Sequence, residues 1–498
     1  MSFAHFASLL FAGSSTLLVV APALAQPAPA PAPPPDDDLE VPAATAPAAE
    51  TPSATVAAPT PPVAKAAPPE QRPAAPAAAF ATPAARLPAP AQSAAAAPRV
   101  AEPGATAPAR ALPAGLQLSG YLHAQYQHSA ASEDQLNASG QPLNEDELVL
   151  RRARLRVERL WDYASATLEL DANTVRGAAV GIRRAEASIF YRGSNATSLP
   201  PLLGLAVGVT DLPFGFELGE SARARIFMER TLGSSALFPT EADAGAKLFG
   251  AFSALRYAVA VSNGEPVDRS GLPHDPNSAK DVTGRFGAEG ELARGFTLAG
   301  GTSFVTGTGF HRGQAARKSV IRWRDDNEDG VLQANEIIAT PGTAATPSKN
   351  FERWVLGLDL QASLATPLGR TILYGEAFVA SSYDRGYAPA DPAVSGVAVR
   401  EAGGYVALAQ ELTPYGLVGL RASIYDPNSD LLETRAAETV PKIQTVKTFS
   451  ALGALALPGR ARLSFQYDFI KDYLARDALG VPSDADNNRW TLRLGVDL

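Results

Sequence analysis

An alternation of apolar and polar side chains with a period of two residues runs from Leu116 to the end of the chain. This feature restricts the possible folds more than any other. In LQLSGYLHAQYQ, Leu116 and Leu122 share one face, whereas Ser119 and His123 share the other. Such alternation is typical of a β-strand with one face in an apolar environment. About 16 segments repeat the pattern, which indicates an all-β fold.

The apolar faces indicate a barrel in a membrane. No apolar run after the N-terminal segment is long enough for a membrane helix. A closed barrel satisfies every backbone group between strands and turns the apolar faces to lipid. Short predicted turns such as Arg159–Asp162 alternate with long loops at Ser129–Glu147, Asp211–Gly245 and Thr306–Glu352. We therefore expect a transmembrane antiparallel β-barrel of about 16 strands over residues 115–498, in the outer membrane of a Gram-negative bacterium.

The first 114 residues have a different composition. Residues 1–25 hold a short apolar run that ends in Ala23-Leu24-Ala25, which predicts a cleaved signal peptide. Residues 26–114 are rich in Ala and Pro and predict a disordered periplasmic linker, since proline lacks an N–H and fixes its own φ. The linker could contact the cell wall or be a tail without a partner. The chain has no cysteine, so no disulfide stabilises it.

Charged residues are predicted to occupy the inner wall of the second and third strands. In RRARLRVE, every second residue is charged and would face the lumen, about 6.6 Å from the next. Guanidinium groups bind phosphate and carboxylate in a fork, which favours an anion path. The carboxylates of the next strand could instead pair with the arginines and form a network within the wall. The predicted pore-lining residues are Arg152, Arg154, Arg156, Glu158, Glu169 and Asp171.

The segment DDNEDGVLQANE follows the spacing of an EF-hand calcium loop, although no predicted helix flanks it. Calcium prefers six to eight oxygen ligands, which carboxylates at alternate positions and a final bidentate glutamate can supply. By strand parity the segment lies outside the cell, between the ninth and tenth strands. A solvated acidic loop is the alternative. The candidate calcium ligands are Asp325, Asn327, Asp329, Val331, Gln333 and Glu336.

Several motifs together resemble the phosphate-selective porin O and P family. They are RRARLRVE, LPFGFE, IFMERTLGSSALFP, YAVAVSNGE and ILYGEAFV, and they extend over nearly all of 116–498. The resemblance implies a trimeric 16-stranded porin whose third outer loop, here Asp211–Gly245, folds inward as a constriction. In that family Lys is usual where this chain has Asp211, and Arg is common where it has Glu241. The arginines implied to lie on the constriction are Arg223, Arg225 and Arg230.

Two other classes of function compete with a porin. An enzyme would need a nucleophile and a base within reach of each other, but His274 and His311 lie in separate predicted loops and no G-x-S-x-G motif is present. A calcium-binding adhesion protein or a barrel that tethers the envelope would use the outer loop or the linker and transport nothing. The expected partners are membrane lipid, lipopolysaccharide and two further copies of the chain. We expect no nucleic-acid partner.

Overall fold

The computed structural model describes residues 110–111, 115–137, 140, 142–175, 177–193, 200–264, 275–435, 437–457, 460–473, 475–476, 482–484 and 486–498. The predicted signal peptide (1–25) and nearly all of the predicted linker (26–114) lie outside these residues, as does His274.

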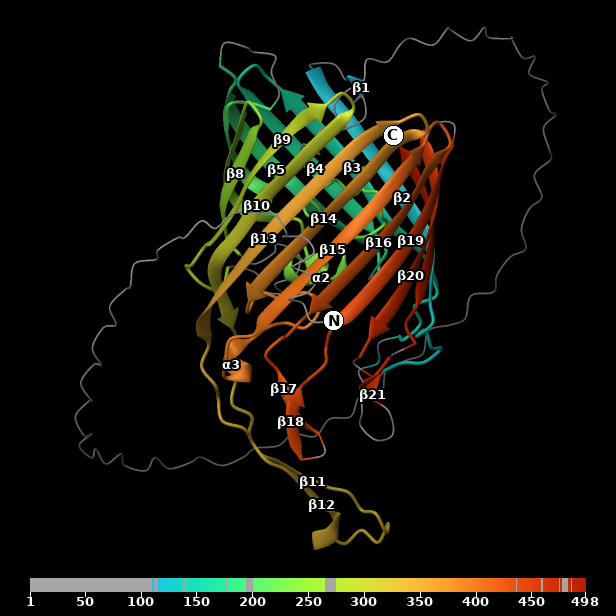
Figure 1. The fold of residues 1–498 in the computed structure, drawn as a ribbon. Coiled ribbons are helices and arrows are strands. Elements are labelled where there is room, and N and C mark those ends of the chain that lie inside the picture. Colours follow the sequence, from blue (N-terminus) through green and yellow to red (C-terminus); the bar gives the residue numbers. More distant parts are fainter. Residues whose placement is uncertain are drawn as a thin grey trace, which may run out of the picture. The chain divides into compact units, whose positions relative to one another are not determined.

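Sixteen strands of the described chain form one antiparallel sheet that closes into a barrel, which confirms the predicted fold class (Figure 1). They are β2 (Leu116–Ser129), β3 (Glu147–Leu160), β4 (Ala164–Asn173), β5 (Ala179–Tyr191), β6 (Leu203–Asp211), β7 (Ala242–Phe252), β8 (Leu255–Ser262), β9 (Asp281–Ala293), β10 (Phe296–His311), β13 (Lys349–Thr366), β14 (Gly369–Ser381), β15 (Arg400–Leu412), β16 (Gly416–Asp426), β19 (Val446–Leu457), β20 (Ala461–Asp472) and β23 (Arg489–Asp497).

Pairing between the first and last of these strands closes the sheet. β23 pairs with β2 from Tyr121↔Asp497 to Ser129↔Arg489, so neither strand is left as a free edge. A short strand, β1 (Arg110–Ala111), also pairs with β2 near its start.

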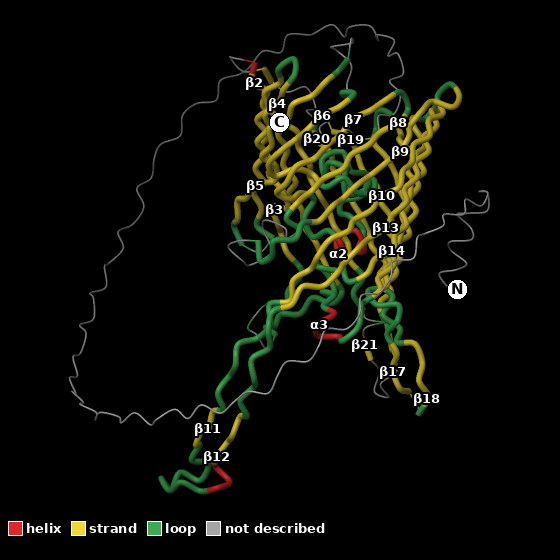
Figure 2. The backbone as a smooth tube through the Cα atoms, turned by 90° about the vertical axis from the view of Figure 1, so that its left-hand side faces the viewer, coloured by secondary structure: helices red, strands yellow, loops and turns green. Residues whose placement is uncertain are grey.

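The connections differ in length at the two ends of the barrel, as the sequence predicted (Figure 1). Short turns join β3 to β4, β7 to β8, β9 to β10 and β13 to β14 at one end, here called the turn end. At the other, the long-loop end, hairpins project from the barrel (Figure 2). The smaller elements of these loops are β11 (Val320–Trp323), η2 (Ala334–Glu336), β12 (Ile337–Thr340), α3 (Pro392–Ser395), β17 (Leu432–Arg435), β18 (Glu438–Pro441), β21 (Ala475–Arg476) and β22 (Pro482–Ser483).

The predicted limits of two long loops were wrong. β10 pairs with β13 as far as His311↔Lys349, so the loop placed at Thr306–Glu352 spans only 312–348. β7 begins at Ala242, so the loop placed at Asp211–Gly245 spans 212–241. The error has one physical cause. Backbone hydrogen bonds continue the sheet regardless of side-chain polarity, whereas the sequence pattern weakens where the strands leave the membrane.

The two faces of the barrel wall differ in polarity. Outward-facing Leu360 and Leu420 are 53% and 49% exposed, whereas their inward-facing neighbours Asp359 and Arg421 are 7% and 5% exposed. No helix in the described part of the chain is long and apolar enough to cross a membrane. A closed barrel with an apolar exterior and a charged interior is the architecture of an outer-membrane protein, and this chain is therefore one.

Candidate functional site

The inner loop, residues 212–241, joins β6 to β7 and folds into the barrel. Its apolar residues explain this course. The rings of Phe214 and Phe238 contact each other with centroids 4.8 Å apart, in a buried cluster with inward-facing Val305 of β10 and Val355 of β13. The short helix α2 (Leu232–Leu237) belongs to this segment and lies inside the barrel (Figure 1). Burial of these side chains against the wall removes them from water and fixes the loop in the lumen.

The middle of the inner loop is also attached to the wall. Phe227 and Met228 lie in a second buried cluster with inward-facing residues of β14, β15 and β19. The backbone amides of Phe216 and Glu217 both donate to the Glu376 carboxylate of β14. These contacts hold one side of the loop, while the arginines of β3 and β5 hold the other.

Three arginines converge on Glu229 of the inner loop. The pairing of β2 with β3 shifts by one residue at Arg151, so Arg151 and Arg152 both point inward, as a β-bulge permits. Glu229 accepts two hydrogen bonds of 2.8 Å from Arg152, one of 3.0 Å from Arg151 Nε and one of 2.6 Å from Arg493 Nη2. Burial disfavours the charge on Glu229, but Arg152 and Arg151 outweigh it and hold the pKa of this carboxyl well below its usual value.

A second bulge makes a similar contact at the ends of the inner loop. The pairing of β4 with β5 shifts at Arg183, so Arg183 and Arg184 both point inward. Arg183 lies 2.6 Å from both Asp211 and Glu241, and Arg184 contacts Asp211. Burial disfavours the charge on Glu241, but Arg183 and its neighbours lower the pKa of this carboxyl well below its usual value. Two arginine doublets thus anchor the loop.

The remaining predicted pore-lining residues form pairs on the wall. Arg154 lies 3.2 Å from Asp171 and 3.6 Å from Glu169, and Arg156 lies 3.0 Å from Glu158. Both arginines face inward and are less than 10% exposed. Arg152, Arg154 and Arg156 are here called the arginine ladder. The structure brings them next to carboxylates, and each has at least one carboxylate partner.

The three arginines predicted on the constriction have different surroundings. Arg223 Nε donates to Asp497 at 2.8 Å, Arg225 Nη2 donates to Glu241 at 3.1 Å, and Arg230 Nη2 donates to the carbonyl oxygen of Phe238 at 2.8 Å. Arg225 is only 2% exposed. Arg225 and Arg230 thus stabilise the loop from within, whereas Arg223 also lines a cavity.

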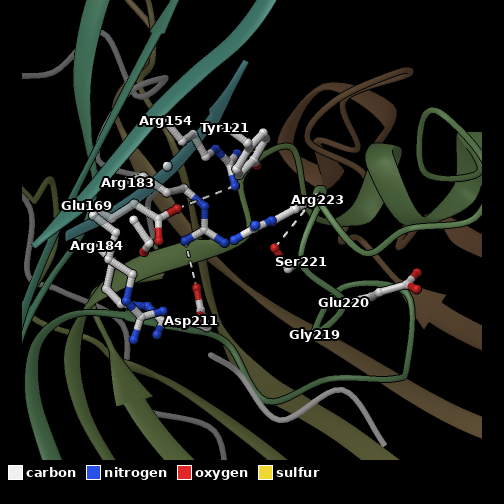
Figure 3. Close-up of a pocket in the computed structure, with 13 residues that line it drawn as sticks. Tyr121, Arg154, Glu169, Arg183, Arg184, Asp211, Gly219, Glu220, Ser221 and Arg223 are labelled. Carbon is white, nitrogen blue, oxygen red and sulfur yellow. Dashed lines mark hydrogen bonds and ion pairs between the residues drawn. The ribbon is translucent and has the colours of Figure 1, made fainter. Parts of the chain in front are cut away.

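That cavity, here called the arginine cavity, encloses about 50 Å³ between the inner loop and the wall (Figure 3). Five arginines and three carboxylates line it, so cationic side chains outnumber anionic ones. The charged lining residues are Arg154, Arg156, Arg183, Arg184, Arg223, Glu169, Asp211 and Glu220.

A larger cavity of about 460 Å³ lies on the other side of the inner-loop segment 216–226. It is here called the turn-side cavity because its lining includes Glu291 and Arg370, which lie next to short turns. Its wall combines apolar side chains such as Ile226 with ion pairs such as Arg256–Glu289, at 2.8 Å. Among the lining residues, only Glu220 borders both cavities.

The candidate calcium loop lies at the tip of the β11–β12 hairpin, in the loop between the ninth and tenth barrel strands (Figure 2). Asp325 accepts from the amides of Asp329 and Gly330, at 3.1 and 2.7 Å. Glu336 is 2% exposed, and its Oε2 accepts from the indole of Trp323 at 2.9 Å. Nowhere in the described ranges do three His, Cys, Asp or Glu side chains gather as metal ligands.

The other candidate ligands lie in the same turn. Asn327 Oδ1 accepts from the Asp329 amide at 3.0 Å, Gln333 Nε2 donates to Asp329 at 2.7 Å, and Val331 is exposed. The loop is therefore closed by its own backbone and side-chain hydrogen bonds.

Sequence reasoning missed Arg151, Arg183 and Arg184, and with them the anchoring role of Glu229. Strict alternation would point Arg151 and Arg183 to lipid, where a charge is costly. Two consecutive arginines inside a predicted strand could therefore have indicated a β-bulge, because a bulge lets both side chains avoid lipid.

Comparison with known proteins finds structural likeness only. No family model and no curated protein matches the sequence. The outer-membrane channel DcaP of Acinetobacter baumannii is 11% identical, with a TM-score of 0.47 over 79% of this chain and 100% of that one. An anion-selective porin from Comamonas acidovorans is 11% identical, with a TM-score of 0.44 over 77% and 98%. OmpT of Vibrio cholerae in its trimer form is 8% identical, with a TM-score of 0.43 over 77% and 99%.

Proposed function

We propose that this chain is a porin, through which small hydrophilic solutes diffuse across the outer membrane. The observation that carries the proposal is the inner loop, which crosses the lumen of a 16-stranded barrel and leaves charged cavities on both sides. A barrel of this size is too wide for wall side chains alone to fill. A loop fixed inside it narrows the passage and presents charges to passing solutes.

The proposed solutes include anions such as phosphate. Five arginines line the arginine cavity, and guanidinium groups bind phosphate in a fork geometry. The preference for anions is weak, because all five arginines already have carboxylate partners. The resemblance to phosphate-selective porins agrees with an anion path. We also propose that the protein forms a homotrimer in contact with lipopolysaccharide and that its linker contacts the cell wall.

Conductance in planar bilayers tests the proposal. We expect the reconstituted protein to give uniform ion-conducting steps, with a small reversal potential of anionic sign in asymmetric KCl. Addition of millimolar phosphate should reduce the chloride current if phosphate occupies the arginine cavity. Absence of conducting steps from protein with the circular dichroism of a folded barrel would overturn the porin proposal.

Catalysis has little support from the positions of the histidines. His128, near the end of β2, pairs with Asp146 at 2.8 Å, and His311, at the end of β10, pairs with Asp391 at 2.5 Å. His123 faces inward on β2 and is 4% exposed. We propose a channel rather than an enzyme.

A surface role that depends on calcium is the second candidate, and the projecting β11–β12 hairpin favours it. We propose that calcium binds the 325–336 loop with a Kd of roughly 10⁻⁴ to 10⁻³ M, as extracellular sites do. The ion would replace the loop's own hydrogen bonds at Asp325 and Asp329. As a surface-only protein, the chain would bind calcium but give no conducting steps.

Limited proteolysis checks the calcium site. We expect millimolar calcium to slow cleavage between Arg324 and Ile338 in the wild type but not in Glu336→Gln, since this substitution removes the bidentate carboxylate. Glu328→Gln is the matched control, because Glu328 stands at a loop position that supplies no ligand. Equal cleavage with and without calcium in the wild type would leave an acidic loop without a metal.

A further inference from the structure

Glu220 stands between the two cavities of the proposed path. It lies in the inner loop and borders both the arginine cavity and the turn-side cavity. Its side chain points away from the arginines that line the arginine cavity (Figure 3), and the residue is 8% exposed. A solute that passes from one cavity to the other would meet this carboxylate.

The other carboxylates of the inner loop all have cationic partners. Glu217 pairs with Arg421 at 3.0 Å, Glu229 with three arginines, and Glu241 with Arg183 and Arg225. Within the described chain, the Glu220 carboxylate has no ion pair and no hydrogen bond. Arg225, five residues away, donates to the backbone oxygen of Glu220 and directs its other contact to Glu241.

A buried carboxylate without a partner does not stabilise the fold. Burial of an unpaired charge costs free energy, and stabilising carboxylates are normally paired or hydrogen-bonded. The Glu220 carboxylate instead borders both cavities, where it can interact with a passing ion.

We propose that Glu220 is the selectivity-determining charge of this channel, which repels anions when ionised and admits them when protonated. This inference rests on the proposed porin function. One loop residue, and not the arginine ladder, then makes the selectivity depend on pH.

The surroundings of Glu220 determine the pH at which its carboxyl group ionises. Burial raises the pKa of Glu220 to about 7, although Arg225 acts in the opposite direction. The charged and titratable groups nearby are Arg225 and Glu217 on its own loop, Tyr374 on β14, Tyr405 on β15, Arg421 on β16 and Arg462 on β20. Free arginine stays cationic and free tyrosine stays mostly neutral between pH 5 and 9. With a pKa of about 7, the Glu220 carboxyl is mostly neutral at pH 5 and mostly ionised at pH 9.

The reversal potential in asymmetric KCl at pH 5, 7 and 9 tests the inference. We expect the chloride-to-potassium permeability ratio of the wild type to fall about three- to tenfold from pH 5 to pH 9, as one charge appears beside the path. Glu220→Gln should hold the high ratio at every pH. Glu133→Gln, exposed in the loop between β2 and β3 and outside both cavities, is the control and should keep the wild-type pH dependence.

A single cysteine separates charge from folding effects. The chain has no cysteine, so Glu220→Cys creates one thiol that small methanethiosulfonate reagents can modify. A sulfonate reagent should lower the chloride preference, and a trimethylammonium reagent should raise it. Conducting channels whose selectivity changes with neither pH nor adduct charge would overturn this inference and leave the porin proposal intact. Absence of any current would overturn both.

Discussion

Substitution of the two anchoring glutamates is expected to release the inner loop. Glu229→Gln removes the carboxylate that three arginines share, and leaves Arg152 and Arg493 buried without a counter-charge. Loss of one partner from a fully buried pair costs about 3–5 kcal/mol. The Glu229 side chain is 34% exposed, so solvent screening makes the cost smaller here. The apolar clusters still hold the loop, so we expect this variant to conduct with greatly increased open-channel noise.

The double variant Glu229→Gln/Glu241→Gln should go further, because it also removes one of the two carboxylate partners of Arg183. We expect the single-channel conductance to rise about twofold or more as the loop leaves its position. Glu133→Gln is the matched control, since Glu133 lies exposed in the loop between β2 and β3. Noise and conductance equal to those of the wild type in both variants, with a normal circular dichroism spectrum, would show that the apolar contacts alone hold the loop.

Removal of the arginine ladder is expected to reverse the selectivity. In Arg152→Ala/Arg154→Ala/Arg156→Ala, the carboxylates that these arginines neutralise, such as Asp171, would carry uncompensated charge into the lumen. A charge about 8 Å from the path contributes about 0.5 kcal/mol at the dielectric constant of water. Three charges together amount to ~1.5 kcal/mol, or about tenfold in the permeability ratio. We therefore expect a cation-selective channel.

The reversal potential of the triple variant in asymmetric KCl measures this change. The matched control replaces the same three arginines by Lys, which keeps the charge and should largely keep the selectivity. An unchanged reversal potential in the alanine variant would mean that these arginines act only within the wall network. The noise of the open channel would show whether loss of Arg152 also loosens Glu229.

Two carboxylates at the ends of the inner loop reduce the number of unpaired arginines. Asp211 ends β6, and Glu241 is the last residue before β7. Here both carboxylates face Arg183, and Asp211 also contacts Arg184. They serve as counter-charges for a bulged strand, which lowers the number of arginines free to hold an anion.

The sequence alone determined the barrel. Successive side chains of a strand point to opposite faces. The alternation of polar and apolar residues, such as Asp359 and Leu360, therefore indicates which face contacts lipid. The number of strands, their parity and the order of short and long connections therefore follow from local pattern. The ladder of Arg152, Arg154 and Arg156 was placed on the inner wall for the same reason.

The tertiary structure decided how those charges are used. Glu229 meets Arg152 and Arg493 across separations of 77 and 264 positions, and no periodicity relates residues so far apart. The bulges at Arg151 and Arg183 depend on the register of the neighbouring strand, which the sequence of one strand does not contain. The same holds for Glu220, whose place between two cavities becomes visible only once the inner loop lies inside the barrel.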